Sequence, residues 1–406
     1  MKTSTYEFIS QNIDRTTKTY DENFSDGIDI PLIKLPYPFT TPCAEGMFQE
    51  MYYWDTYFTH KCLLLTKRGG QVRNNLLNFA FLLDEYGKIL NGNRMHYVNR
   101  SQPPFFGLML FDALQLGENI IDLAQAFALL EKEYAFWMEK RSAPNGLQKY
   151  DCDLEKAFSM VGYYADRTGV ALSDTEENNR GVIAECESGW DFSPRFHSQS
   201  TRYNPVDLNC LLYADEVLLA AWAKQLGDSD KARRYALAAA ERKEKIQSLM
   251  KKDGVYFDYN FADRKCSDVV SCAAFFPYFV GLDDNKDGFL KTLSALERDY
   301  GVVACDYNKG NFQWSAPNSW APLNYVAVAT AFRLGLTEVS ARLAEKYLAV
   351  TDKIYAKTER LWEKYNALTG DLDVASEYGT PEMLGWSAGV YTAFYHFRES
   401  GYKSLI

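Results

Sequence analysis

The stretch that decides the fold class is residues 206–251, which read VDLNCLLYADEVLLAAWAKQLGDSDKARRYALAAAERKEKIQSLMK. The first part is dense in Leu and Ala and ends before Gly227, a residue that commonly terminates helices, so we expect a helix over Val206–Leu226. Ser and Asp at 229–230 are residue types that cap helices, and a second helix is expected over Lys231–Lys251. Two helices joined by a few polar residues predict a helical hairpin.

The same helix–turn–helix pattern recurs along the rest of the chain. Residues Ile121–Lys140 are expected to form a helix, because their large apolar residues alternate at spacings of four and three: Leu123, Phe127, Leu130, Tyr134 and Trp137. Further helices are expected over Leu323–Leu334, Val339–Lys357 and Pro381–Glu399. Short strand-like pieces, such as 254–259, predict only hairpin or loop strands. Because no linker rich in Pro, Gly or Ser divides the chain, the pattern predicts one large all-helical domain.

The composition is that of a packed globular protein. The chain has 406 residues, of which 47% are hydrophobic and 24% charged, and this balance excludes disorder and collagen-like structure. Its 44 Lys and Arg residues against 54 Asp and Glu residues give a net charge of -10, which disfavours nucleic acid as a partner. Aromatic residues make up 15% of the chain, and flat apolar rings with polar edges suit the faces of sugars.

Location, cofactors and assembly are predicted from simpler features. The residues from Met1 to Glu7 lack the apolar stretch of a secretory signal, and no run of 18 or more apolar residues predicts a membrane span. The eight cysteines are scattered without a Cys-x-x-Cys pair, which is typical of buried thiols in a reducing compartment. These features predict a cytoplasmic protein. The four histidines lack metal-ligand spacing, and we expect no metal, no cofactor and a monomer.

One polar stretch resembles the first half of a calcium-binding loop. It runs over 283–288 and reads Asp-Asp-Asn-Lys-Asp-Gly. The twelfth position of such a loop needs a bidentate Glu, but this chain has Ser294 there. We therefore expect a polar turn before a helix at Phe289.

Four polar, aromatic stretches between the expected helices have the composition of a carbohydrate site. They lie at 48–55, 91–104, 187–195 and 313–322, and a fifth stretch at 362–366 adds another carboxylate. Each of the four combines amides, carboxylates or Arg with aromatic or Pro residues. A saccharide needs this mixture, with aromatic faces for C–H surfaces and polar groups for neighbouring hydroxyls. Loops on a rigid scaffold are also where binding and catalytic residues concentrate.

The order and the amino-acid sequences of these stretches resemble those of the trehalase family of glycoside hydrolases, from about Gly46 to Tyr391. The segment at 46–58, GMFQEMYYWDTYF, is similar to the first signature of that family. The segment that opens with Gln313-Trp314 and ends with Trp320-Ala321-Pro322 is similar to its second signature. The other similar motifs are NGNR at 91–94, RSQPPFF at 100–106 and SGWDFS at 188–193.

The resemblance implies an all-α fold, an (α/α)6 toroid with long loops and a few short β-hairpins at the active-site end. The corresponding expectation for the domains is a single unit over residues 1–406, with 1–40 as an N-terminal extension packed on the toroid. Members of the family invert the anomeric centre with two carboxyl groups from separate loops. Carried over by motif, Asp191 is the general acid and Glu363 is the general base.

The resemblance also implies a set of substrate-binding residues. The positions that match residues holding the glucosyl unit are Trp54, Asp55, Asn91, Arg100, Gln102 and Gly189. Glu377 aligns with a further carboxylate that contacts sugar. The aromatic residues of the matched segments complete the expected site: Phe48, Trp190, Trp314 and Trp320. Both direct sugar contact and packing between helices remain open for Trp314 and Trp320.

The two carboxyl groups suit inverting chemistry. An inverting hydrolase needs an acid that protonates the leaving oxygen and a base that activates water on the opposite face, with the carboxyls about 6.5–9.5 Å apart. The apolar neighbour Trp190 is expected to raise the pKa of Asp191 and keep this acid protonated near neutral pH. Lys364 is expected to favour the carboxylate form of Glu363.

Three places depart from the family pattern. Met47 stands where the family has Arg, Ser315 stands where it has Asp, and residues 166–174 lack an Arg-Pro-Glu segment. The family's arginines contact the leaving sugar, and an apolar side chain does not replace their hydrogen bonds. The leading interpretation is an inverting hydrolase of a small α-glucoside, with trehalose as the first substrate. The alternatives are a related glycosidase acting on another α-glucoside or on mannosylglycerate, and a sugar-binding protein without activity.

Overall fold

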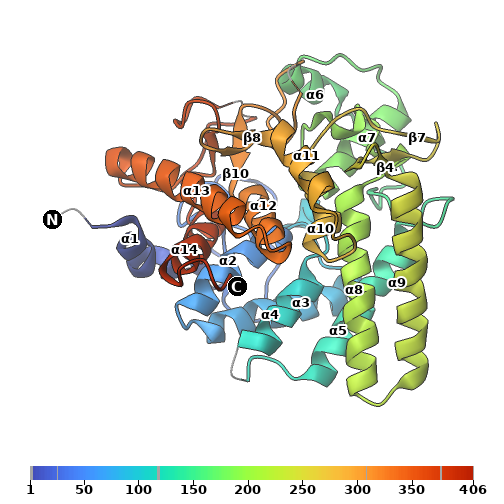
Figure 1. Cartoon of the computed structure of the whole chain (residues 1–406), viewed down its shortest axis with the longest axis horizontal. Coiled ribbons are helices and arrows are strands. Elements are labelled where there is room, and N and C mark those ends of the chain that lie inside the picture. Colours follow the sequence, from blue (N-terminus) through green and yellow to red (C-terminus); the bar gives the residue numbers. More distant parts are fainter. Residues whose placement is uncertain (1–2, 25, 117–118, 308, 375–376, 406) are drawn as a thin grey trace.

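The computed structural model describes residues 3–24, 26–116, 119–307, 309–374 and 377–405. Helices form the frame of the chain (Figure 1). The described α-helices are α1 (Thr5–Asn12), α2 (Tyr53–Leu65), α3 (Gly69–Tyr86), α4 (Phe106–Leu116), α5 (Leu123–Lys140), α6 (Val161–Thr168), α7 (Glu176–Glu187), α8 (Val206–Gln225), α9 (Ser229–Leu249), α10 (Phe276–Phe279), α11 (Lys286–Leu296), α12 (Ala321–Arg333), α13 (Thr337–Thr358) and α14 (Gly385–Glu399). The short 3₁₀ helices are η1 (Ile13–Thr16), η2 (Met95–Tyr97), η3 (Pro194–Phe196), η4 (Ser200–Arg202) and η5 (Cys272–Phe275).

Six of the described helices close into an inner ring, in which each helix contacts the next: α2, α4, α8, α10, α12 and α14, with α14 returning to α2. Six others pack outside this ring and alternate with it along the chain: α1, α3, α5, α9, α11 and α13. The alternation is interrupted by α6 and α7, which contact each other and lie together at one edge of the molecule (Figure 1). The arrangement confirms the (α/α)6 toroid expected from the sequence.

The position of each helix in the two layers follows from its side chains. Every residue of α2 from Tyr53 to Leu63 is buried, as expected for a helix that is enclosed on all sides. The outer helix α9 is different, because its buried residues form one stripe at spacings of four, three and four: Tyr235, Ala239, Arg242 and Ile246. A narrow buried stripe packs against one neighbouring helix and leaves the opposite, charged face in water.

No helix of the described residues is both long enough and apolar enough for a membrane crossing.

The predicted hairpin at 206–251 is confirmed as α8 and α9, which pack along their length. Its second helix is capped by Asp228, whose side chain accepts the N–H of Lys231 at 2.9 Å. The cap therefore lies one residue before the pair that the sequence analysis favoured. The other predicted long helices match α5, α12 and α13 to within a few residues.

The last predicted helix begins later than expected, at Gly385 and not at Pro381. The N–H of Met383 donates to Leu361 O at 2.9 Å, and the N–H of Glu363 donates to Pro381 O at 3.2 Å. These backbone groups pair with a neighbouring segment, so they do not enter a helix. The pairing also fixes the backbone of Glu363.

Short antiparallel strands tie the loops together, as expected. The described strands are β1 (Thr17–Lys18), β2 (Phe39–Thr40), β3 (Tyr203–Asn204), β4 (Lys251–Lys252), β5 (Val255–Tyr256), β6 (Tyr259–Asn260), β7 (Lys265–Cys266), β8 (Glu297–Arg298), β9 (Gly301–Val302), β10 (Asn318–Trp320) and β11 (Lys364–Asn366). They pair as β1–β2, β3–β6–β7, β4–β5, β8–β9 and β10–β11. In the last pair Trp320 lies opposite Lys364, which joins two segments of the expected carbohydrate site.

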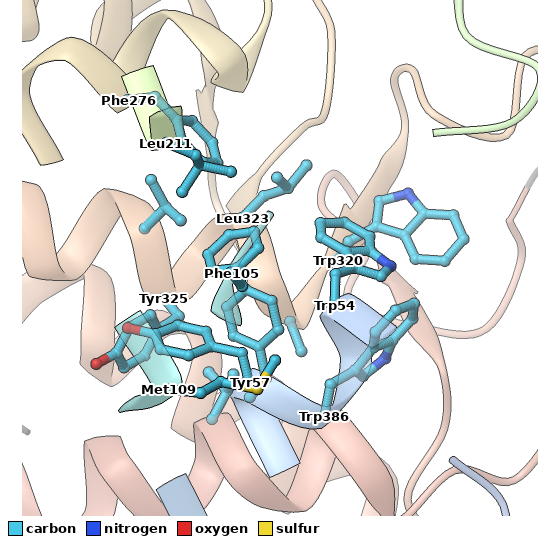
Figure 2. Packing of buried hydrophobic residues seen from close by; sticks show 14 of the residues in the cluster. Trp54, Tyr57, Phe105, Met109, Leu211, Phe276, Trp320, Leu323, Tyr325 and Trp386 are labelled. Carbon is cyan, nitrogen blue, oxygen red and sulfur yellow. The ribbon is translucent and has the colours of Figure 1, made fainter. Parts of the chain in front are cut away.

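The interior of the ring is filled by large aromatic side chains (Figure 2). Tyr57 and Phe105 pack with ring centroids 4.8 Å apart, and Tyr57 also contacts Tyr325. Trp54 and Trp386 lie at one side of this packing (Figure 2), and their ring centroids are 5.9 Å apart. The ring is therefore a packed core, and its indole groups mark the end where the loops gather.

Candidate active site

A cavity of about 330 Å³ lies where the long loops meet the ring. Such a volume falls within the range of about 300–1,000 Å³ that is typical of small-molecule sites. Of the thirteen predicted site residues, twelve line this cavity: Phe48, Trp54, Asp55, Asn91, Arg100, Gln102, Gly189, Asp191, Trp314, Trp320, Glu363 and Glu377. Side chains more than 300 positions apart in the sequence thus face one space.

The first turn of α2 supplies the inner part of the cavity. The backbone N–H of Trp54 donates to Gln102 Oε1 at 3.1 Å, which joins the first matched segment to the second. Asp55 is buried beside it, and burial raises the pKa of Asp55 to about 8, with further contributions from the nearby carboxyls of Glu363 and Asp191. The site therefore brings three acidic groups close together.

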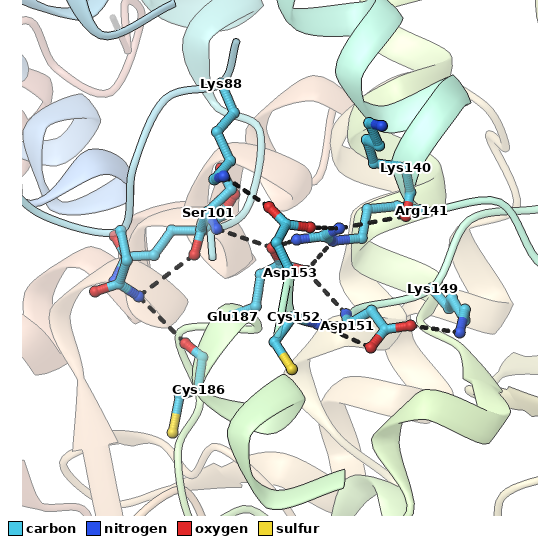
Figure 3. A network of polar contacts seen from close by, with 12 residues as sticks. Lys88, Ser101, Lys140, Arg141, Lys149, Asp151, Cys152, Asp153, Cys186 and Glu187 are labelled. Atoms are coloured by element: carbon cyan, nitrogen blue, oxygen red, sulfur yellow. Dashed lines mark hydrogen bonds and ion pairs between the residues drawn. The ribbon is translucent and has the colours of Figure 1, made fainter. Parts of the chain in front are cut away.

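A buried ion pair holds the loops on one side of the cavity (Figure 3). Arg141, which follows α5, donates from Nε and Nη2 to the two carboxylate oxygens of Glu187, both at 2.8 Å. Glu187 also accepts the N–H groups of Ser101 at 2.8 Å and Asp151 at 2.9 Å. The pair thereby fixes the loop at 100–102 against the end of α7.

The polar side chains of Asn91 and Arg100 are placed by contacts with neighbouring residues. Asn91 Nδ2 donates to Cys186 O at 3.3 Å. Arg100 Nη1 donates to Asn99 Oδ1 at 2.9 Å, and its guanidinium lies 4.9 Å from the centroid of the Tyr97 ring. Arg100 Nε is buried and has no hydrogen-bond partner among the residues that the structure describes. A buried donor of this kind is well suited to a polar ligand.

The turn after α7 needs glycine. Gly189 has φ +70°, and a Cβ at this position would lie 3.1 Å from Trp54 Cε2. Glycine adopts this left-handed conformation without strain and allows the close approach of the indole. The turn brings Asp191 to the cavity wall, where its backbone carbonyl accepts Gln313 Nε2 at 3.2 Å.

The carboxyl group of Asp191 has the environment of an acid. Burial raises the pKa of Asp191 to about 7, and the negative charge of Glu377 adds to the shift, whereas the charge of Arg100 opposes it. At neutral pH a substantial fraction of this carboxyl therefore carries a proton. The expectation of a raised pKa is confirmed, with loss of solvation as the main cause.

Trp190 is the one predicted site residue that does not line the cavity. Its ring is fully buried and stacks on Trp314 at 5.3 Å with an interplanar angle of 18°. The Arg195 guanidinium lies 4.4 Å from the Trp190 ring centroid. Trp190 thus supports the aromatic wall, because Trp314 stands between it and the cavity. Trp314 in turn stacks on Trp320 at 3.9 Å and 5°, so these two rings both pack together and line the cavity.

Glu363 is held by several donors. The ammonium group of Lys364 forms an ion pair with Glu363 Oε2, and the Tyr378 hydroxyl donates to Glu363 Oε1 at 2.7 Å. The indole Nε1 of Trp386 donates to the backbone carbonyl of Glu363 at 3.0 Å. Both carboxylate oxygens thus have a donor, and the two contacts fix the orientation of the carboxylate. Lys364 and Glu363, although adjacent in sequence, thus contact each other through their side chains.

Glu377 lies on the same side of the cavity as Asp191. It accepts a hydrogen bond from the Tyr163 hydroxyl and another from Gln313 Nε2, the latter at 3.3 Å. Burial raises the pKa of Glu377, and the charge of Arg167 opposes this shift. A loop near the C-terminus is thereby joined to α6.

The three departures from the family pattern have different surroundings. Met47 is 41% exposed and does not line the cavity. Ser315 is buried, and its hydroxyl donates to Tyr307 O at 2.7 Å, so it holds the loop. The region 166–174 includes the end of α6, where the Arg167 guanidinium lies 4.8 Å from the centroid of the Tyr163 ring.

Sequence reasoning missed several lining residues. Tyr378 and Gln313 lie within or beside matched segments, so their neighbours were a signal that could have identified them. Met160 and Tyr163 also line the cavity, but they belong to a region that matches no motif. Only the folded chain brings that region to the site.

The calcium-like stretch forms a polar turn, as expected. Asp283 accepts hydrogen bonds from Lys251 at 2.6 Å and from the Tyr256 hydroxyl at 2.7 Å. The side chain of Asn285 caps α11, which begins at Lys286, earlier than the expected Phe289. Among the described residues, no group of three or more His, Cys, Asp or Glu side chains is arranged to hold a metal ion.

Comparison with known proteins gives a consistent set of relatives. The profile of the family described as Trehalase matches residues 4–398. The periplasmic trehalase of Xanthomonas oryzae pv. oryzae is 35% identical over 393 residues, covering 88% of this chain and 68% of the relative. The periplasmic trehalase of an Escherichia coli strain is 32% identical over 390 residues, with the same coverage.

Solved structures agree with the fold. Neutral trehalase from Saccharomyces cerevisiae superimposes with a TM-score of 0.76 at 27% identity, covering 98% of this chain and 80% of the yeast chain. A mannosylglycerate hydrolase from Thermus thermophilus has a TM-score of 0.62 at 15% identity, covering 88% of this chain and 95% of that chain. The second likeness concerns the fold alone.

The relatives contradict the cytoplasmic location predicted from the sequence, because they are named periplasmic trehalases. The cysteines do not distinguish the two compartments, for a physical reason. All eight cysteines, which lie in the described part of the chain, are free thiols that are buried or half-buried. Buried thiols are shielded from oxidants in either compartment, so they carry little information about location.

Fold, cavity and relatives agree on one identification. The matched family covers nearly the whole chain, and the matched motifs meet at a single cavity. The chain belongs to the trehalase family and is a glycoside hydrolase.

Proposed function

We propose that this protein hydrolyses trehalose with inversion at one anomeric centre, using Asp191 as general acid and Glu363 as general base. The observation that carries the proposal is that these two carboxyl groups line one cavity in contrasting environments. Burial raises the pKa of Asp191 to about 7, whereas Glu363 is held by an ammonium and a hydroxyl donor. Environments that separate two carboxyl groups in this way are typical of an acid and base pair.

Asp191 donates the proton that the leaving oxygen needs. A carboxyl that titrates near the working pH is efficient as a general acid. Its protonated form is well populated at that pH, and its proton is transferred readily. Its backbone is fixed by Gln313 and by the turn at Gly189, so the side chain is presented to the cavity from a rigid segment. Positioning of this kind contributes to the rate, because a misplaced acid loses proton transfer.

Glu363 activates the attacking water from the other side of the glucosyl unit. The donors Lys364 and Tyr378 orient its carboxylate, and the pairing of β10 with β11 fixes the adjacent backbone. An inverting mechanism places this water between the base and the anomeric carbon. The leaving sugar departs on the side of Asp191.

The glucosyl unit is held by the remaining predicted residues of the cavity. Trp54, Trp314 and Trp320 supply apolar ring atoms to the cavity wall, as suits the C–H surfaces of a pyranose. Asn91, Arg100, Gln102 and Asp55 supply the hydrogen-bonding groups for its hydroxyls. Trehalose as the substrate is supported by relatives that are named trehalases and by a cavity of about 330 Å³.

The test is glucose release from trehalose by the purified protein and by two variants. Asp191→Asn and Glu363→Gln keep the size of each side chain and remove its proton chemistry. Each is expected to lower kcat by about 10²–10⁴-fold or more, the range of general acid–base catalysis. Glu382→Gln removes an exposed acid that pairs with Arg360, and this control is expected to keep wild-type turnover. Wild-type turnover in either cavity variant would refute the proposal. Hydrolysis of mannosylglycerate, measured as mannose release, without hydrolysis of trehalose would also refute it.

A further inference from the structure

The side of the cavity that meets the leaving group is defined by the acid. A general acid lies next to the oxygen that it protonates, so the leaving group lies beside Asp191 and away from Glu363. This step rests on the proposed function. The side chains that surround Asp191 on the open side of the cavity are therefore the ones that can contact the leaving group.

Phe192, which follows Asp191, connects the acid to α6. Its ring lies 5.7 Å from the Tyr163 ring at an interplanar angle of 58°, and both side chains line the cavity. Met160, the residue before α6, lines it as well. Three apolar surfaces from 160–192 therefore stand next to the acid.

Tyr163 marks the mouth of the cavity. It is 41% exposed, whereas Trp54 and Trp320 are buried at the inner wall. The leaving group must pass the mouth when it departs, so a lining residue that is open to solvent on the side of the acid is well placed to contact it. Met47, by contrast, is exposed outside the cavity.

The Tyr163 ring is also held in place. Its hydroxyl donates to Glu377 Oε1, and the Arg167 guanidinium, one turn further along α6, lies 4.8 Å from the ring centroid. A ring fixed by contacts at its hydroxyl and its face loses little conformational freedom when a ligand packs against it. The hydrogen bond also joins α6 to the loop of Glu377 across the mouth.

We propose that Tyr163 is a specificity-determining residue, whose ring forms, with Met160 and Phe192, the surface that contacts the leaving group. Apolar and aromatic surfaces favour a leaving group that is itself a ring with a C–H face, such as a pyranose. The substrate class is therefore an α-glucoside of a cyclic sugar. Met160 and Tyr163 lie in a part of the chain that no matched motif covers.

The test compares two substrates with the same glucosyl unit. Trehalose carries a pyranose leaving group, whereas α-glucosyl fluoride carries a single atom that cannot reach Tyr163. Tyr163→Ala is expected to lower the ratio of kcat/KM for trehalose to kcat/KM for the fluoride by about tenfold, the size of one aromatic contact. Tyr163→Phe keeps the ring. Because the ring contact is kept, the ratio in this variant is expected to stay within about twofold of the wild-type ratio.

Phe158→Ala is the matched control. Phe158 is an aromatic residue of the same segment, 51% exposed and outside the cavity lining, so its removal is expected to leave the ratio unchanged. A ratio that stays at the wild-type value in Tyr163→Ala overturns the inference while hydrolysis itself still supports the proposed function. A fall of equal size in Phe158→Ala also overturns it. If the wild-type protein releases glucose from neither substrate, the proposed function fails and the inference fails with it.

Discussion

Trp320 and Lys364 lie opposite one another in the antiparallel pair of β10 and β11, and the ammonium of Lys364 is 4.6 Å from the centroid of the Trp320 ring. The same ammonium forms the ion pair with Glu363. A pair of three-residue strands therefore joins the aromatic wall of the cavity to the proposed base. The contact is buried, so neither partner is easily replaced.

Lys364→Met tests that contact, because it removes the cation and keeps a long side chain. Loss of the ammonium removes one of the two donors that hold the Glu363 carboxylate, so kcat for trehalose is expected to fall by about tenfold, or about 1.4 kcal/mol at the transition state. The free energy of unfolding is expected to fall by about 3–5 kcal/mol, as when a buried pair loses one partner. Lys132→Met removes an exposed partner of Asp84 and is expected to change neither quantity measurably. Wild-type turnover in Lys364→Met would contradict this account.

Glu187→Gln tests the ion pair between Arg141 and Glu187, which holds the loop at 100–102. It leaves Arg141 buried with Asp153 as its remaining charged partner, and urea unfolding is expected to show a loss of about 3–5 kcal/mol. Because the loop at 100–102 is released, KM for trehalose is expected to rise more than kcat falls. Asp84→Asn, in an exposed pair, is expected to cost less than about 1 kcal/mol. Equal stability losses in the two variants would show that Glu187 has no special role.

The pH dependence follows from the raised pKa of Asp191. The acid must be protonated, so kcat/KM is expected to fall as the pH rises through about 7. The same shift acts on stability in a defined direction. The folded state holds this proton more tightly than the unfolded chain, so the contribution of Asp191 to stability is full below about pH 4 and is lost as the pH rises to about 7.

Asp191→Asn separates the two effects. Its unfolding free energy, relative to wild type, is expected to be higher at pH 8 than at pH 4, because Asn carries no charge to bury. Denaturant unfolding at the two pH values measures this difference. A relative stability that is the same at both pH values would mean that Asp191 titrates normally.

Gly189→Ala is expected to damage the site through geometry. The added Cβ meets Trp54 at 3.1 Å in a backbone conformation that L residues rarely adopt. Gly227→Ala is the matched control, since Gly227 has φ +83° and open space around its Cβ position. Both variants are expected to lose about 1–2 kcal/mol from backbone strain. Only Gly189→Ala is expected to lower kcat/KM by tenfold or more, about 1.4 kcal/mol at the transition state, and similar kinetics in the two variants would contradict the role of Gly189.

Local patterns predicted much of this structure. Apolar spacing identified α5, and the Leu- and Ala-rich stretch before Gly227 identified α8, because such features are set by residues near in sequence. The loop motifs predicted which residues gather at the cavity, since each motif carries several side chains of the same site. The start of α14 was missed because residues 381–383 pair with residues 361–363, about twenty positions earlier, and local sequence does not encode that partner.

The remaining differences also arise from contacts between distant residues. Trp190 was expected at the sugar, but stacking with Trp314 places it behind the wall. Tyr163 was not expected at the cavity, because its contacts there, with the Phe192 ring and the Glu377 carboxylate, join it to residues distant in the sequence. The Arg141–Glu187 pair likewise joins residues 46 positions apart, and no short motif contains both.

The most direct measurement is proton NMR of α-glucosyl fluoride hydrolysis during its first minutes. Two carboxyl groups separated by one water predict that the protein releases β-glucose first, with the α-anomer appearing only as the sugar equilibrates. Release of α-glucose first would contradict the account. That outcome would require a covalent intermediate, with one carboxyl attacking the sugar directly and the two carboxyls only about 5–5.5 Å apart.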